Sequence, residues 1–306
     1  MDLALLQMPM VLFTTLVPMA SGAFIGLVLA FLTTRFSKER LARIDRWTLL
    51  PMAILAVGYI ASFVALSSPQ YSMSLFQGVD IAPLSFVGIA GMLFIALAVV
   101  YWIIAMTGNL DERPRKVFAT VVGAASLLLS LSIGVMYMGS AVLTWNSPLV
   151  PLGIIGFCIA GGVPLGVLVV ALAGGMPEAR LTRLPTVALV TAFIGVVAAI
   201  VAVSAQLLFA QSTFNAFFPG SDVLPGSWVY LVISIVGFVV MLATLRATLM
   251  PGGRNVAAAI PLRDREDVDA DAPVGVRSAI PLLVAGNAAV LIGIFVARLM
   301  FYALQV

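Results

Sequence analysis

The sequence predicts an all-α integral membrane protein that crosses the bilayer eight times. Of its 306 residues, 62% are hydrophobic and only 9% are charged, and the mean hydropathy is +1.16. A soluble domain is about 25% charged, so a water-facing fold is excluded. Apolar runs of about 18 residues or more recur along the chain, and each is long enough to span the hydrocarbon layer as a helix. The runs lack the alternation of a membrane β-barrel, so the spans are helical.

The chain is predicted to be a single membrane domain over residues 1–306. The first apolar run is long and has no basic segment before it, so we expect a retained helix rather than a cleaved signal peptide. The predicted spans cover residues 8–33, 47–68, 82–106, 115–138, 148–173, 185–209, 227–248 and 277–304.

The distribution of the 16 Lys and Arg residues predicts the topology. They lie at 35–46, 113–116, 180–183 and 246–277, with Arg298 alone inside span eight. The loops after the even-numbered spans hold none. Basic residues near span ends stay in the cytoplasm, so both termini are expected outside the cytoplasmic (inner) membrane. The formal net charge of +3 therefore reflects topology, and no nucleic acid partner is expected.

The loops on the two sides differ in composition. The cytoplasmic loop 249–275 mixes acidic residues with Pro, Gly and Ala, and is expected to be flexible. The outer loops are nearly uncharged and carry aromatic residues, a composition typical of a partner-docking surface and also of the aromatic belt at the headgroups. Both interpretations stay open. The docking candidates are Tyr71, Phe76, Trp145 and Phe217.

An internal repeat is indicated by glycine spacing. Superposing Gly22 on Gly162 also superposes Gly26 on Gly166, and carries the first spans of one half onto those of the other. Four spans per repeat preserve orientation, so we expect two parallel four-helix halves, at about 1–140 and 141–306. Small residues four apart also permit close helix contact.

Several kinds of redox centre are excluded by composition. There is no histidine and only one cysteine, Cys158, so a haem held by histidines, an iron–sulfur cluster and a histidine metal site are not expected. No metal site is predicted. Arg298 is the one ionisable residue within a span, where such residues are functional candidates. An alternative is that Arg298 lies near the outer surface and extends its charge into water.

Several short motifs, in this order along the sequence, resemble the membrane anchor subunit family of dimethyl sulfoxide reductase. They are Ala61-Ser62, Leu66-Ser67-Ser68-Pro69, Leu84-Ser85, Thr144-Trp145-Asn146-Ser147, Gly161-Gly162-Val163-Pro164-Leu165-Gly166 and Arg298-Leu299-Met300-Phe301-Tyr302. The resemblance implies an anchor that binds menaquinol as a substrate, holds no haem, and passes electrons to an iron–sulfur subunit. It implies two partners on the outer face: a four-cluster ferredoxin-like subunit and a molybdopterin catalytic subunit.

The resemblance also reveals departures from the family pattern. The position of a family glutamate is Val87, that of a frequent histidine is Ala65, and that of an arginine is Val229. Quinol oxidation releases protons, so a site needs polar groups beside an apolar cavity.

We expect Asp80, Ser85, Arg298 and Tyr302 to line a quinol pocket near the outer surface, because all four lie at outer helix ends. The departures leave a purely structural anchor open. The repeat leaves a small-molecule transporter open, although the absence of an intramembrane carboxylate argues against an ion-coupled carrier.

Overall fold

The computed structural model describes residues 6–67, 81–108, 110–213, 226–250 and 279–304, with backbone only for 65–67 and 81–85. Eight helices in this part of the protein are long and apolar enough to cross a membrane, as predicted. They are α2 (Met8–Thr33), α4 (Leu49–Ser67), α6 (Ile81–Met106), α7 (Glu112–Val135), α8 (Leu149–Leu172), α10 (Leu184–Ser212), α12 (Ser227–Leu249) and α14 (Ala279–Ala303).

Two shorter helices lie where loops were expected. These are α3 (Lys38–Trp47) and α9 (Met176–Arg180). The Ser37 side chain accepts a hydrogen bond from the Arg40 amide at the start of α3, with Glu39 in its first turn and Arg46 in its last. That arrangement caps the helix and complements its dipole. The loop between spans one and two is therefore largely helical.

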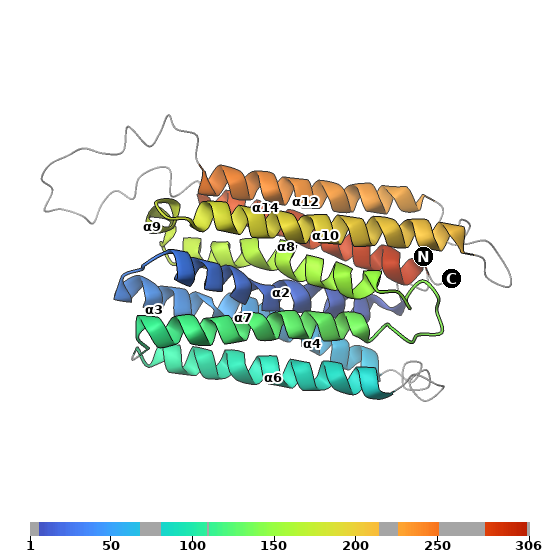
Figure 1. The fold of residues 1–306 in the computed structure, drawn as a ribbon, viewed down its shortest axis with the longest axis horizontal. Coiled ribbons are helices and arrows are strands. Elements are labelled where there is room, and N and C mark those ends of the chain that lie inside the picture. Colours follow the sequence, from blue (N-terminus) through green and yellow to red (C-terminus); the bar gives the residue numbers. More distant parts are fainter. Residues whose placement is uncertain (1–5, 68–80, 109, 214–225, 251–278, 305–306) are drawn as a thin grey trace, which may run out of the picture.

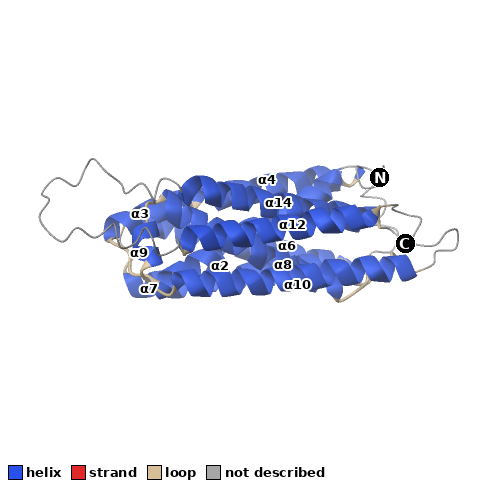
Figure 2. Cartoon of the chain, turned by 90° about the horizontal axis from the view of Figure 1, so that it is seen from above, coloured by secondary structure: helices blue, strands red, loops and turns tan. Residues whose placement is uncertain are grey.

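The long helices run alternately up and down a single bundle, and α2 begins at the end where α14 finishes (Figures 1 and 2). We call this the uncharged end, because the connections there lack Lys and Arg. The opposite end, with α3 and α9, is the basic end. Which end faces the cytoplasm stays a prediction from the positive-inside rule.

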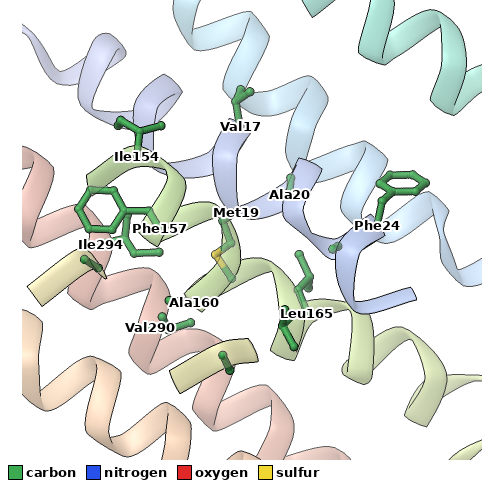
Figure 3. Close-up of a cluster of buried hydrophobic side chains, with 14 of the residues drawn as sticks. Val17, Met19, Ala20, Phe24, Ile154, Phe157, Ala160, Leu165, Val290 and Ile294 are labelled. Carbon is green, nitrogen blue, oxygen red and sulfur yellow. The ribbon is translucent and has the colours of Figure 1, made fainter. Parts of the chain in front are cut away.

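The core lies around α2 and α8, the most deeply buried helices of those described. Figure 3 shows Met19 of α2 near Phe157 of α8 and Ile294 of α14. Many large apolar side chains are exposed on α4, α6, α10 and α12. They form the surface that the lipid bilayer would cover.

Glycines allow α2 and α8 to pack with their backbones in direct contact. A Cβ on Gly22 would collide with the Cys158 carbonyl, and one on Gly162 would collide with the backbone of Gly22. Gly26 and Gly166 meet in the same way one turn further on. The spacing of these small residues permits close helix contact, and the structure shows that the two motifs contact each other.

The helices of the first four spans pack against one another in the same pairs as those of the last four, as two parallel halves would. The α2 helix packs on α4 as α8 packs on α10, and α6 packs on α7 as α12 packs on α14. The α2–α8 contact joins the first helix of each set. The division at 1–140 and 141–306 stays a prediction. Most of loop 249–275 lies outside the described residues.

Candidate functional site

The uncharged end contains a buried arginine. Arg298, on the last turns of α14, is only 2% exposed. Its Nε donates a hydrogen bond to Oγ1 of Thr14 on α2 at 2.9 Å, while the Thr14 hydroxyl donates to the Met10 carbonyl at 2.8 Å. Its Nη2 is buried and has no hydrogen-bond partner among the described residues.

Aromatic rings surround the Arg298 guanidinium. Its Cζ lies 4.0 Å from the ring centre of Phe301, 5.1 Å from that of Tyr302 and 5.4 Å from that of Tyr137. At such distances the negative face of a ring attracts a cation. No carboxylate pairs with Arg298 in the described part of the protein. The alternative that Arg298 extends into water is wrong, because the rings enclose it.

Two more contacts join these side chains into one group, which we call the arginine–aromatic cluster. Its members are Thr14, Tyr137, Trp145, Arg298, Phe301 and Tyr302. The hydroxyl groups of Tyr137 and Tyr302 are hydrogen bonded to each other. The Trp145 indole stacks on Phe301 with ring centres 5.4 Å apart. The cluster thus combines a cation, two hydroxyl groups and an apolar surface.

Helix spacing and one connection position these groups. Arg298, Phe301 and Tyr302 lie three and four residues apart, so they share a face of α14. The connection between α7 and α8 then covers the end of α14. The Thr144 hydroxyl donates to the Leu304 carbonyl at 2.6 Å, and the Trp145 indole donates to the Phe301 carbonyl at 3.2 Å. These bonds satisfy carbonyls that a helix end leaves unpaired.

A narrow cleft adjoins the cluster. Its volume is about 10 Å³, close to the space of a single water. A quinone ring would not fit without movement of side chains. The cleft is lined by Thr144, Gln206, Ala210, Met300, Phe301 and Leu304.

The structure brings together three of the predicted site residues: Arg298 and Tyr302 from the quinol set, and Trp145 from the docking set. Ser85 lies near the start of α6, where only the backbone is described. The remaining predictions lie outside the described residues: Asp80, Tyr71, Phe76 and Phe217.

Sequence analysis missed Thr14 and Tyr137. A threonine within a span is common, and Tyr137 follows the end of α7 with no motif around it. Only the convergence of α2, α14 and the connection after α7 makes them candidates. At the positions that depart from the family, Val87 is buried in the core whereas Val229 is 60% exposed on α12.

The cluster combines hydrogen-bond donors with aromatic surface. The described residues hold no group of three or more Cys, Asp or Glu that could bind a metal ion. An arginine and tyrosine hydroxyls donate hydrogen bonds to carbonyl or hydroxyl oxygens, and aromatic side chains contact the ring.

The family model of the DMSO reductase anchor subunit (DmsC) matches residues 1–251, most of the protein. The chain belongs to this family. The resemblance found in the sequence motifs is therefore confirmed. The DMSO reductase anchor subunit match ends before α14, so it does not bear on Arg298 or Tyr302.

Curated relatives of this anchor subunit have consistent names. The C subunit of anaerobic dimethyl sulfoxide reductase from Haemophilus influenzae is 27% identical over 163 residues, 53% of this protein and 58% of that relative. The C subunit from Escherichia coli is 26% identical over 157 residues, 51% of this protein and 55% of that relative. The anaerobic dimethyl sulfoxide reductase subunit YnfH of Escherichia coli is 26% identical over 145 residues, 47% of this protein and 48% of that relative. The matched segment thus spans about half the length of each relative.

Proposed function

We propose that this anchor subunit binds menaquinol at the arginine–aromatic cluster and passes its electrons to an iron–sulfur subunit, which in turn serves a molybdopterin catalytic subunit. The family and the names of the relatives support the anchoring role. Both partners would bind at the uncharged end, on the outer face of the inner membrane.

The observation that carries the quinol site is the buried Arg298 with an unpaired Nη2. A buried cation with a free donor is costly unless a ligand accepts the hydrogen bond. A quinol or quinone oxygen supplies that acceptor and brings no charge of its own. The surrounding rings of Tyr137, Phe301 and Tyr302 suit an aromatic headgroup.

The reaction sets the roles of the residues. A quinol that becomes a quinone loses two electrons and two protons, so the site needs proton acceptors as well as a donor that orients the ring. In this proposal Arg298 and the Tyr302 hydroxyl orient the oxygens. Asp80, with Ser85 close to it in sequence, accepts protons at the outer surface.

A purely structural anchor is the second candidate, and one observation favours it. The cleft beside the cluster is too small for a quinone ring. The ring would have to enter by displacing side chains, whereas a structural anchor needs no cavity. The two candidates differ in whether Arg298 affects electron transfer after the complex has assembled.

The test uses the complex purified from its native membrane through a tag on the anchor subunit. Co-purification of an iron–sulfur protein tests the anchor role, and its absence would overturn that role. Reduction of the partner's clusters by a menaquinol analogue is then followed by absorbance. We expect Arg298→Gln to lower the rate per bound partner about tenfold or more, because a hydrogen bond from a charged group is lost.

Two further variants separate the candidates. Tyr302→Phe keeps the ring and removes the hydroxyl, and should also slow cluster reduction. Arg113→Gln removes an exposed arginine at the opposite end and should leave the rate unchanged. If Arg298→Gln and Tyr302→Phe complexes both match the wild-type rate, the quinol site is elsewhere or absent, and the structural anchor is the better account.

A further inference from the structure

A large cavity lies at the basic end, away from the arginine–aromatic cluster. It has a volume of about 470 Å³, within the range of ligand-binding pockets. Its walls come from α2, α3, α6 and α7 and the connections beside them. Its charged lining residues are Arg35, Lys38, Asp45, Asp111, Glu112, Arg115 and Lys116.

A buried ion pair forms the inner wall of this basic-end pocket. Nη1 of Arg115 lies 2.5 Å and 2.6 Å from the two carboxylate oxygens of Asp45, and both side chains are at least 95% buried. Asp45 also accepts a hydrogen bond from the Tyr101 hydroxyl at 3.4 Å. The negative charge of Asp45 is therefore neutralised by its own partners.

Arg115 keeps one donor free. Its Nη2 donates to the Leu110 carbonyl at 3.4 Å, but its Nε is buried and has no hydrogen-bond partner in the described part of the protein. Buried donors in proteins are nearly always paired. Arg115 is also one of the residues that line the pocket, so it adds a positive charge to the pocket wall.

The remaining charges leave the pocket positive. Lys116 pairs with Glu112 at 2.7 Å, which neutralises both. Arg35 and Lys38 are exposed and take part in none of the ion pairs found among the described residues. Of the three carboxylates that line the pocket, Asp111 alone takes part in none of these ion pairs, and it is exposed. The ligand that this balance favours is an anion.

The start of α7 adds backbone donors to the same pocket. Asp111 is the N-cap residue, but its side chain makes no capping hydrogen bond. The amide groups of Glu112 and Arg113 therefore remain available, whereas Pro114 has no N–H, and the positive end of the helix dipole favours a negative ligand there. Phosphate groups bind at helix starts for these reasons.

Exposed apolar side chains on the helices that form the pocket favour a lipid over a soluble anion. Leu32, Met106 and Val117 are 55%, 43% and 66% exposed, and each is close in sequence to residues that line the pocket. Trp47, at the end of α3, is 42% exposed, as is common for aromatic residues at a membrane interface. Charge in the pocket with apolar surface beside it suits an amphiphile.

We propose that the basic-end pocket binds the phosphate group of an anionic phospholipid, with the acyl chains against the exposed apolar side chains of α2, α6 and α7. Arg35 and Lys38 attract the phosphate, and the free amides at the start of α7 donate hydrogen bonds to it. Basic pockets between helices on the cytoplasmic side bind such headgroups. The site is independent of the proposed quinol site.

The test measures phospholipid binding to the full-length protein in neutral detergent by native mass spectrometry. Phosphatidylglycerol should bind more tightly than zwitterionic phosphatidylethanolamine. Arg35→Gln combined with Lys38→Gln should weaken phosphatidylglycerol binding about tenfold or more, because each basic residue near the headgroup contributes to affinity. Both side chains are exposed, so folding should persist, and a thermal unfolding scan checks this.

The matched control is Arg46→Gln with Arg113→Gln, which removes two exposed positive charges from α3 and α7 without touching the pocket lining. Its phosphatidylglycerol affinity should stay within about twofold of wild type. An equal loss in both double variants would overturn the site in favour of general charge attraction. Inorganic phosphate that displaces phosphatidylglycerol at matched concentration would overturn the lipid assignment in favour of a soluble anion.

Discussion

At the scale of single residues, two buried arginines show how the same charge is stabilised in different ways. Arg115 at the basic end pairs with Asp45, whereas Arg298 at the uncharged end has only ring faces and the Thr14 hydroxyl. Sequence analysis singled out Arg298 because it lies inside a span. It missed Arg115, because a residue counted among loop charges gives no sign that it folds inward.

The Arg115–Asp45 pair should contribute strongly to stability. Arg115→Ala leaves the Asp45 carboxylate buried without a partner, which typically costs about 3–5 kcal/mol. We expect a large fall in the thermal unfolding temperature of the detergent-purified protein.

Two comparisons check the reason for that fall. Lys116→Ala breaks an exposed pair with Glu112 and should lower the unfolding temperature little, because water screens such a pair. Replacing both members of the buried pair, Arg115→Met with Asp45→Leu, should recover much of the loss, because no charge is then stranded. If Arg115→Ala unfolds no earlier than Lys116→Ala, the buried pair is not a major source of stability.

At the scale of elements, glycine explains why two helices rather than others occupy the centre. The α2 and α8 backbones touch at Gly22 and Gly162, where any side chain would collide. In lipid there is little hydrophobic drive for helices to associate, so close van der Waals packing has to supply it. The spacing of these glycines was visible in the sequence and permitted a close helix contact, but only the structure shows that α2 and α8 are the partners.

Gly162→Ala should therefore destabilise the bundle. The added methyl group meets the Gly22 backbone, which cannot rotate away, and overpacking of this kind typically costs about 1–3 kcal/mol. A lower unfolding temperature in detergent would register the effect. Gly88→Ala on α6 is the matched control, since nothing lies within 4 Å of its added Cβ, and the unfolding temperature should be equal or higher. Equal behaviour of the two variants would refute the packing account.

Element boundaries were predicted well and short helices were not. The hydrophobic run fixes where a span can lie, because backbone groups in lipid need an intrahelical partner. The α3 helix depends instead on the Ser37 cap and on contacts with α6 and α8. Its sequence is strongly charged, so hydropathy alone assigned it to a loop.

At the scale of the whole molecule, the bundle places the start of α2 and the end of α14 together, while the charge pattern predicts which side they face (Figure 1). The two kinds of evidence are independent. Because the number of described spans is even, the start of α2 and the end of α14 lie at the same end of the bundle. The positions of the basic loops predict which side of the membrane that end faces.

Cysteine labelling tests this orientation. Cys158 is fully buried, so the wild-type protein should show little reaction with a membrane-impermeant maleimide. In spheroplasts we expect Ala141→Cys, at the uncharged end, to react at once. Ser37→Cys, at the basic end, should react only after the membrane is disrupted. The reverse pattern would invert the topology, and reaction of both variants before disruption would contradict the alternation of spans.

The sequence by itself determined the eight spans and the family, and it predicts the orientation. These follow from local composition, charge distribution and short motifs. Only the tertiary structure showed that α2 and α8 meet at their glycines, that Arg298 is enclosed by rings from α14 and the connection after α7, and that Arg115 lines a large pocket. The physical reason is that burial and pairing of a charge depend on residues far apart in the sequence, whose convergence no local pattern records.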